Sequence, residues 1–116
     1  MNDMEKSCKD NVTALTPSEI EKLLGELADW QQHELVISKT YSFKNYYQTI
    51  AFVNAIAWVS HREDHHPDLA VTYNTCRVSY STHSVDGLST NDFICAAQID
   101  ALFKPLAQMF IATLNP

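Results

Sequence analysis

The sequence predicts an α+β domain of two layers, in which three helices cover one face of a four-stranded antiparallel sheet in the order α-β-β-α-β-β-α. Three observations lead to this prediction. Capping signals precede two segments whose apolar residues recur at helical spacing. Segments that are typical of strands come in pairs separated by short turns, as in hairpins. The length of 116 residues suits one domain.

Composition narrows the classes of function. The hydrophobic fraction of 46% is ordinary for a globular protein, and the formal net charge of -6 argues against direct binding of nucleic acid. No apolar run approaches the roughly 18 residues of a membrane span, and the N-terminus lacks a signal-peptide pattern, so we expect no membrane partner. The three cysteines Cys8, Cys76 and Cys95 form no CxxC pair, which predicts a reducing, cytoplasmic location.

The first helix has a strong start signal. Residues 1–12 are polar and are expected to form a flexible tail, which leaves a single domain over residues 13–116. Thr16 can cap free backbone amides, Pro17 suits the first helical position, and Glu19 completes a capping box. Apolar residues at helical spacing carry the predicted helix to about Leu27.

The next segment predicts a hairpin. Trp30 to about Gln32 is expected to pair with a strand that begins near Leu35, with the turn near His33-Glu34. Period-two alternation in this strand indicates one buried face, which Lys39 interrupts. The apolar residues on that face are Leu35, Ile37, Tyr41 and Phe43.

A long second helix is predicted from Lys44 or Asn45. It should stop around His66, because Pro67 disfavours helix in the residue before it. On a continuous helix His61 and His65 would share a face one turn apart. One stripe of this helix, with Tyr and Trp side chains expected in the core or in an oligomer interface, consists of Tyr47, Ile50, Ala51, Asn54, Ala57, Trp58 and His61.

Two further strands and a helix complete the chain. Residues 69–73 and 76–82 are predicted strands joined by a tight turn, with Val78 and Tyr80 inward. A capping signal from Ser89 to Asp92 then opens a helix that runs through residue 103. Pro105 should end or kink this helix, and residues 106–114 are either a further helical turn or an ordered tail.

Clustered histidines suggest proton transfer or metal binding. His65 and His66 stand together before Pro67, and His83 follows Ser81-Thr82. Imidazole accepts or donates a proton near neutral pH without a large shift of its pKa, so these three are candidates for general acid–base catalysis. His61 by itself favours a structural role at a helix end. The carboxylates that could orient the histidines are Asp64, Asp68 and Asp92.

A metal site is the main chemical alternative. His61 and His65 have the spacing of two ligands on one helical face, and Glu63 or His83 could be the third. The His-Glu-x-x-His order is absent, because position 62 is Arg62, and no cysteines cluster. We therefore expect no bound metal.

These residues carry a resemblance to a known family. The sequence resembles the pterin-4a-carbinolamine dehydratases (4a-hydroxytetrahydrobiopterin dehydratases), and the resemblance covers about Leu15 to Phe103. Trp30 resembles the family's first strand, and residues 41–46 its approach to the long helix. The motifs that carry the resemblance are His65-His66-Pro67-Asp68, Tyr73, Ser81-Thr82-His83, Gly87-Leu88-Ser89 and Asp92.

The resemblance implies a fold of the same element order and a homodimer or homotetramer. It implies a hydro-lyase that removes water from a 4a-hydroxytetrahydropterin to give the quinonoid dihydropterin. The partner would be this small-molecule pterin. The activity would recycle the pterin cofactor used by aromatic amino acid hydroxylases, and no metal or cofactor would be needed.

The resemblance also implies roles for individual residues. His65 and His83 would act as acid and base, and His66 would bind and position the pterin, so all three form the catalytic set. Asp64 and Asp92 would support the site, although Asp92 could also merely cap its helix. The residues expected to bind substrate are His61, His65, His66, Pro67, Thr82, His83, Ser84 and Val85.

The chain departs from the family pattern at two places. His61 stands where Glu is common, which puts a role for that position in doubt, and Leu69-Ala70 replaces a common aromatic, which affects stacking in the pocket. Two alternatives to the enzyme remain. One is a non-catalytic dimerisation or assembly module on the same fold, and the other is the His-ligated metal protein.

Overall fold

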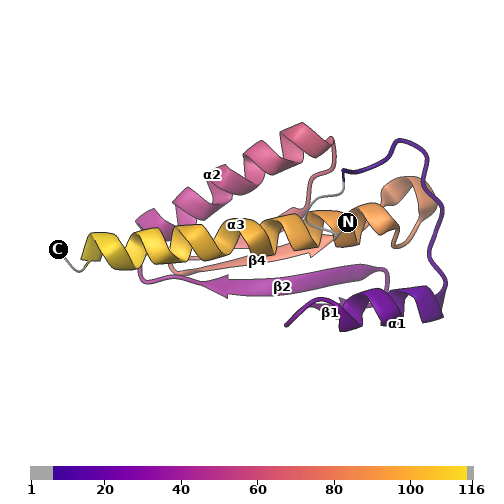
Figure 1. Ribbon diagram of the computed structural model, residues 1–116, viewed down its shortest axis with the longest axis horizontal. Helices are drawn as coiled ribbons and strands as arrows, with labels where there is room; N and C mark the ends of the chain where they lie inside the picture. Colours follow the sequence, from indigo (N-terminus) through magenta and orange to yellow (C-terminus); the bar gives the residue numbers. More distant parts are fainter. Residues whose placement is uncertain (1–6, 115–116) are drawn as a thin grey trace.

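The computed structural model describes residues 7–114 and confirms the predicted element order (Figure 1). A four-stranded antiparallel sheet carries three helices, and a short 3-10 helix, η2, precedes the last one. The elements are α1 (Pro17–Gly25), β1 (Gln31–His33), β2 (Val36–Ser42), α2 (Tyr46–Glu63), β3 (Asp68–Val71), β4 (Thr75–Tyr80), η2 (His83–Val85) and α3 (Thr90–Leu114).

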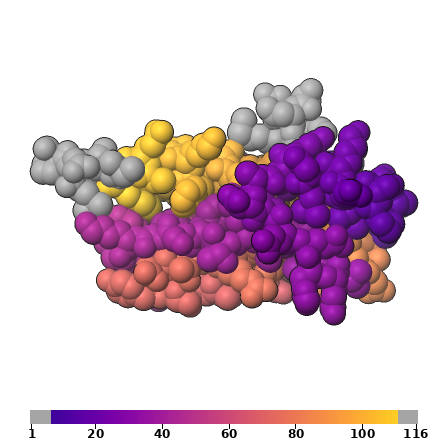
Figure 2. Space-filling view, turned by 90° about the horizontal axis from the view of Figure 1, so that it is seen from below, coloured from indigo at the N-terminus to yellow at the C-terminus, as the bar shows by residue number. Residues whose placement is uncertain are grey.

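The sheet has the strand order β1-β2-β4-β3, and every neighbouring pair is antiparallel. Alternate residues of the central strands are buried beneath the helices, among them Ile37 opposite Tyr80 and Tyr41 opposite Cys76. Helices α2 and α3 lie over this face (Figure 1), and Figure 2 shows the salmon β3–β4 region and the yellow part of α3 on opposite sides of the molecule. Leu35 was predicted to point inward but is 55% exposed, because it lies in the turn before β2 begins.

The residues that cap α1 were read correctly from the sequence. The Glu19 amide donates to Thr16 Oγ1 at 3.3 Å, and the Thr16 amide donates to Glu19 Oε1 at 2.9 Å. The helix ends at Gly25, two residues before the predicted Leu27. Its buried Ile20 joins the same core as the sheet residues.

The core side of α2 differs from the predicted stripe. Thr49, Phe52, Ile56 and Val59 are buried, whereas Tyr47 is 81% and Trp58 63% exposed. The prediction followed the aromatic residues Tyr47 and Trp58, which lie on the outer side of the helix. The side chains that pack into the core are instead Phe52 and its neighbours Ile56 and Val59. The prediction that this stripe lies in the core is therefore wrong, and the oligomer-interface alternative remains.

Pro105 does not end α3, which continues to Leu114. A proline inside a helix removes one backbone hydrogen bond and is locally unfavourable. Here Phe103 and Leu106 flank it and pack against the core, and the Phe110 ring lies 6.4 Å from the Phe43 ring. This packing outweighs the local cost, so residues 106–114 form the further helical turns that the sequence left open.

None of the helices within residues 7–114 is both long and apolar enough to cross a membrane. Residues 1–6 of the expected flexible tail lie outside the described residues. Cys8 and Lys9 of the same segment make defined contacts, described below with the candidate site.

Candidate functional site

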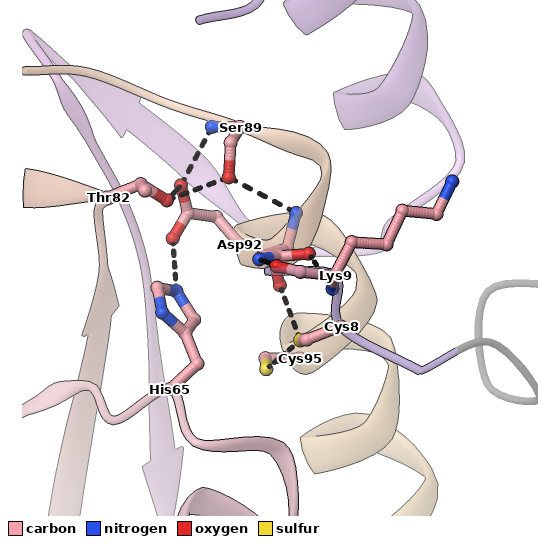
Figure 3. A network of polar contacts seen from close by, with 8 residues as sticks. Cys8, Lys9, His65, Thr82, Ser89, Asp92 and Cys95 are labelled. Atoms are coloured by element: carbon pink, nitrogen blue, oxygen red, sulfur yellow. Dashed lines mark hydrogen bonds and ion pairs between the residues drawn. The ribbon is translucent and has the colours of Figure 1, made fainter. Parts of the chain in front are cut away.

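Four polar side chains meet where β4 ends and α3 begins: His65, Thr82, Ser89 and Asp92 (Figure 3). The end of α2 delivers the first of them. Asp64 closes that helix in a left-handed conformation with φ 52°, so the chain turns away from the helix axis. His65, the next residue, donates its amide to the Ser60 carbonyl at 3.2 Å and directs its side chain toward α3.

Asp92 is the centre of the network and its side chain is fully buried. Its Oδ1 lies 2.7 Å from Nε2 of His65. Its Oδ2 accepts hydrogen bonds from the Thr82 hydroxyl at 2.8 Å and from the Ser89 amide at 3.0 Å. Asp92 therefore completes the cap of α3 and orients His65, two roles that the sequence did not separate.

His65 is held on its ring face as well as its edge. The ring stacks on Tyr80, with centroids 5.5 Å apart and planes 15° apart, and the side chain is 15% exposed. If Nε2–H donates to the Asp92 carboxylate, Nδ1 is the proton acceptor of the neutral ring. A carboxylate that holds an imidazole in one orientation is an arrangement suited to proton transfer.

The turn after β4 carries a second histidine, His83, directly after the Thr82 that contacts Asp92. Thr82 exchanges backbone hydrogen bonds with Gly87, its amide donating to the Gly87 carbonyl at 2.8 Å. The closed loop between them forms η2, in which His83 and Ser84 are exposed and Val85 is half-buried. The buried Thr82 hydroxyl on Asp92 thus anchors the exposed His83 beside it in sequence.

The structure brings together only part of the predicted set. His61, Asp64 and His66 are exposed and Pro67 is half-buried. No hydrogen bond described within residues 7–114 joins His66 or His83 to the His65–Asp92 pair. Side-chain hydrogen bonds within residues 7–114 thus link three members of the predicted set: His65, Thr82 and Asp92.

The helical basis for a metal site is absent. Because α2 ends at Glu63 and Asp64 is left-handed, His61 and His65 do not share a helical face as predicted. In the described part of the chain, no group of three or more His, Cys, Asp or Glu side chains is arranged to hold a metal ion.

A segment near the N-terminus packs behind the site, which sequence reasoning missed. The Cys8 amide donates to Glu63 Oε1 at 2.8 Å. Lys9 and Asn91 exchange two hydrogen bonds, from the Lys9 amide to Asn91 Oδ1 at 2.9 Å and from Asn91 Nδ2 to the Lys9 carbonyl at 2.8 Å. The Cys8 and Cys95 sulfur atoms lie 3.3 Å apart (Figure 3).

Sequence reasoning also missed two supporting side chains. Tyr80 was predicted only as a core residue, yet its ring forms the platform for His65. Ser89 was predicted only as part of a cap, yet its hydroxyl lies 2.8 Å from the Thr82 hydroxyl. Alternation along the strand predicts that Tyr80 points inward, so its burial could be read from the sequence. No spacing in the sequence predicts the contact between Ser89 and Thr82.

Comparison with known proteins identifies a family. The sequence model of the family described as pterin 4 alpha carbinolamine dehydratase matches residues 13–102. A protein of Nitrosomonas europaea that bears the provisional name pterin-4-alpha-carbinolamine dehydratase is 63% identical over 100 residues, covering 85% of this chain and 88% of that protein. A relative of the same provisional name in Bdellovibrio bacteriovorus is 60% identical over 102 residues, covering 81% and 85%.

Two solved structures share the fold. The transcriptional coactivator/pterin dehydratase of Brucella melitensis is 29% identical, with a TM-score of 0.75 over 78% of this chain and 98% of that chain. A pterin dehydratase-like protein described as a RuBisCO assembly factor in the alpha-carboxysome is 26% identical, with a TM-score of 0.54 over 63% and 84%. With a match over most of its length and relatives of this identity, the chain belongs to the pterin-4a-carbinolamine dehydratase family of hydro-lyases.

Proposed function

We propose that this protein removes water from a 4a-hydroxytetrahydropterin to give the quinonoid dihydropterin. The observation that carries the proposal is the buried Asp92 carboxylate 2.7 Å from His65, in a member of this family. The reaction breaks the bond between C4a and its hydroxyl and removes the proton from N5. The nitrogen electron pair then forms the C4a=N5 double bond, and the hydroxyl departs as water after it is protonated.

The described geometry supports a division of labour among the histidines. His65 has the buried Asp92 behind it, which favours proton transfer through a ring of fixed orientation. His83 is exposed on the anchored turn and acts as the second proton-transfer group, while His66 positions the pterin. In this proposal His61, Pro67, Thr82, Ser84 and Val85 complete the binding surface, Asp64 supports it, and no metal or cofactor is required.

Turnover of synthetic 4a-hydroxytetrahydropterin, followed by ultraviolet absorbance in metal-free buffer, tests the proposal. We expect His65→Ala and His83→Ala each to lose about 10²- to 10⁴-fold in kcat, the range typical of acid–base groups. His33→Ala is a matched control, because His33 is an exposed histidine on β1. No acceleration by the wild type over the spontaneous reaction, with the fold intact by circular dichroism, would refute the dehydratase.

We also propose that α2 contributes to a homo-oligomer. The exposed residues Tyr46 and Tyr47 line a groove of about 410 Å³ along this helix with Ile50, Ala51 and Asn54, and Trp58 is exposed further along the helix. Three exposed aromatic side chains on one helix form an apolar surface that a second copy of the chain would bury. Trp58→Glu should shift the mass measured by sedimentation toward the monomer, whereas Glu21→Gln on α1 should not.

A non-catalytic assembly module is the second candidate, favoured by the structural likeness to the RuBisCO assembly factor. Inactive wild-type protein that still oligomerises through α2 and binds a partner stably would support it. For the enzyme, we propose a cytoplasmic site of action and functional coupling to an aromatic amino acid hydroxylase. A coupled assay in which the protein raises hydroxylase turnover at limiting pterin tests this coupling.

A further inference from the structure

Cys8 and Cys95 come together from opposite ends of the chain. They are 87 residues apart in sequence, and their sulfur atoms lie 3.3 Å apart. Cys95 is buried on α3, one turn after Asp92, while Cys8 is half-buried with exposed neighbours on either side. A disulfide has sulfur atoms about 2.05 Å apart, so a shift on the order of 1 Å would join them.

Several hydrogen bonds hold the segment of Cys8 against α2 and α3, so the contact between the two thiols does not depend on the sulfur atoms alone. The Cys8 amide is fixed by Glu63 at the end of α2, and the Cys8 thiol also donates to the Asn91 carbonyl at 3.7 Å. The paired hydrogen bonds between Lys9 and Asn91 fix Lys9, the residue after Cys8, onto the first turn of α3.

From this geometry we propose that Cys8 and Cys95 form a reversible intramolecular disulfide that fastens the segment around Cys8 to α3. With hydrogen peroxide as the oxidant, the Cys8 thiol loses its proton and the thiolate attacks one oxygen, breaking the O–O bond. This gives a sulfenic acid and hydroxide, which takes up a proton to become water. The Cys95 sulfur then displaces the hydroxyl from Cys8, forming the S–S bond and releasing the second water. Both sulfur atoms are oxidised, and the peroxide receives the two electrons.

The order of these steps follows from the surroundings of the two thiols. The hydrogen bond with Cys8 and burial raise the pKa of Cys95, so its thiol remains protonated until it reacts. Cys8 is the one that an oxidant in solvent can reach. Glutathione or another thiol reductant would reverse the reaction, which is how such a bond operates in a reducing compartment.

Cys76 provides an internal reference. It is buried in β4 with no exposed surface, and burial raises its pKa to about 11. Among the three cysteines we therefore expect Cys76 to stay reduced while the other two react together.

The test is oxidation of the fully reduced protein by a small excess of hydrogen peroxide. We expect the intact mass to fall by two hydrogens, one free thiol to remain under denaturing conditions, and a peptide linking Cys8 to Cys95 after proteolysis. Closing so long a loop should raise the midpoint of thermal unfolding by roughly 10 °C, and dithiothreitol should reverse the rise.

Variants separate the disulfide from general oxidation. Cys8→Ser and Cys95→Ala should each abolish the mass change and the thermal shift, whereas Cys76→Ala should retain both. If Cys95→Ala fails to fold, Cys8→Ser decides the question, because its side chain lies near the surface. Cys8 recovered only as a higher oxide or in a disulfide between two chains, with Cys95 still reduced, would overturn the proposal. So would three free thiols after peroxide treatment.

Discussion

The backbone amide of Cys8 donates a 2.8 Å hydrogen bond to the side chain of Glu63, the last residue of α2, across 55 positions of sequence. Arg62 donates to the other carboxylate oxygen at 3.0 Å. Burial by itself would raise the pKa of Glu63, but the hydrogen bonds from Cys8 and Arg62 prevail and lower it. This carboxylate thus joins the N-terminal segment to the helix that delivers His65.

Glu63→Gln should remove a pH-dependent part of the stability. A carboxylate whose pKa is lower in the folded state stabilises the fold above its unfolded pKa of about 4.3, and this stabilisation is lost as the pH falls through the folded pKa. The wild type should therefore exceed Glu63→Gln in free energy of unfolding near pH 7, and the gap should narrow as the pH falls from about 4.3 through the folded pKa. Urea unfolding across this range measures the difference. A gap that stays constant with pH would contradict the assignment, and Glu21→Gln is the exposed control.

Asp92→Asn should affect stability and turnover together. The buried carboxylate accepts from Thr82 and Ser89 and contacts His65, and an amide keeps the shape but offers one acceptor oxygen. We expect a loss of about 1 to 3 kcal/mol in the free energy of unfolding. A fall in kcat of about 10²-fold or more should accompany it, because His65 loses the carboxylate that orients its ring.

Thr82→Val separates these two consequences. It removes the hydroxyl that donates a hydrogen bond to Asp92 but leaves the contact between Asp92 and His65 in place. Its cost should fall mainly on the free energy of unfolding measured in urea, with kcat reduced less than in Asp92→Asn. Equal losses of kcat in the two variants would contradict a direct role of the Asp92–His65 contact.

His66→Ala and His83→Ala should leave stability almost unchanged while turnover falls. Both side chains are exposed, so the free energy of unfolding should change by no more than about 0.5 kcal/mol. A lower kcat in His83→Ala and a higher KM in His66→Ala are the expected split. Parallel urea unfolding and steady-state kinetics check it, and a large loss of stability in either variant would show a structural role instead.

Asp100→Ala should lower the free energy of unfolding, because Asp100 holds together a cluster of three donors. Its carboxylate accepts from Trp30 Nε1 at 3.0 Å, from Lys39 Nζ at 2.8 Å and from the Tyr41 hydroxyl. Losing it leaves three donors, one of them charged, without their partner, so we expect a loss of about 2 to 4 kcal/mol. Urea unfolding measures it, with Gln108→Ala on the exposed side of α3 as control. A change below about 0.5 kcal/mol would mean that water replaces the carboxylate.

This cluster also explains where prediction from sequence succeeded and failed. Alternation along β2 was enough to predict the strand, and Lys39 looked like an interruption of its buried face. The residue that makes Lys39 acceptable there, Asp100, stands 61 positions later, and local patterns carry no information on such a contact.

The same reasoning applies to the site. The capping signal at Ser89 predicted the start of α3, and the resemblance to the family predicted a hydro-lyase. Tyr80 as the platform for His65 and the return of Cys8 to α3 depend on how distant segments pack. The outward orientation of Tyr47 was missed because periodicity on α2 allowed two apolar sides, and only tertiary packing selected the one with Phe52.

Helix α3 begins at the site and runs along the molecule to its opposite end (Figure 1). At a rise of about 1.5 Å per residue, Leu114 lies roughly 30 Å from Asp92. The family match ends at residue 102, so the last turns of the helix are an extension beyond it. The distance from Asp92 to Leu114 is far beyond the reach of any side chain, so a fluorophore or an immobilisation tag placed at the C-terminal end of α3 would not obstruct the His65–Asp92 pair.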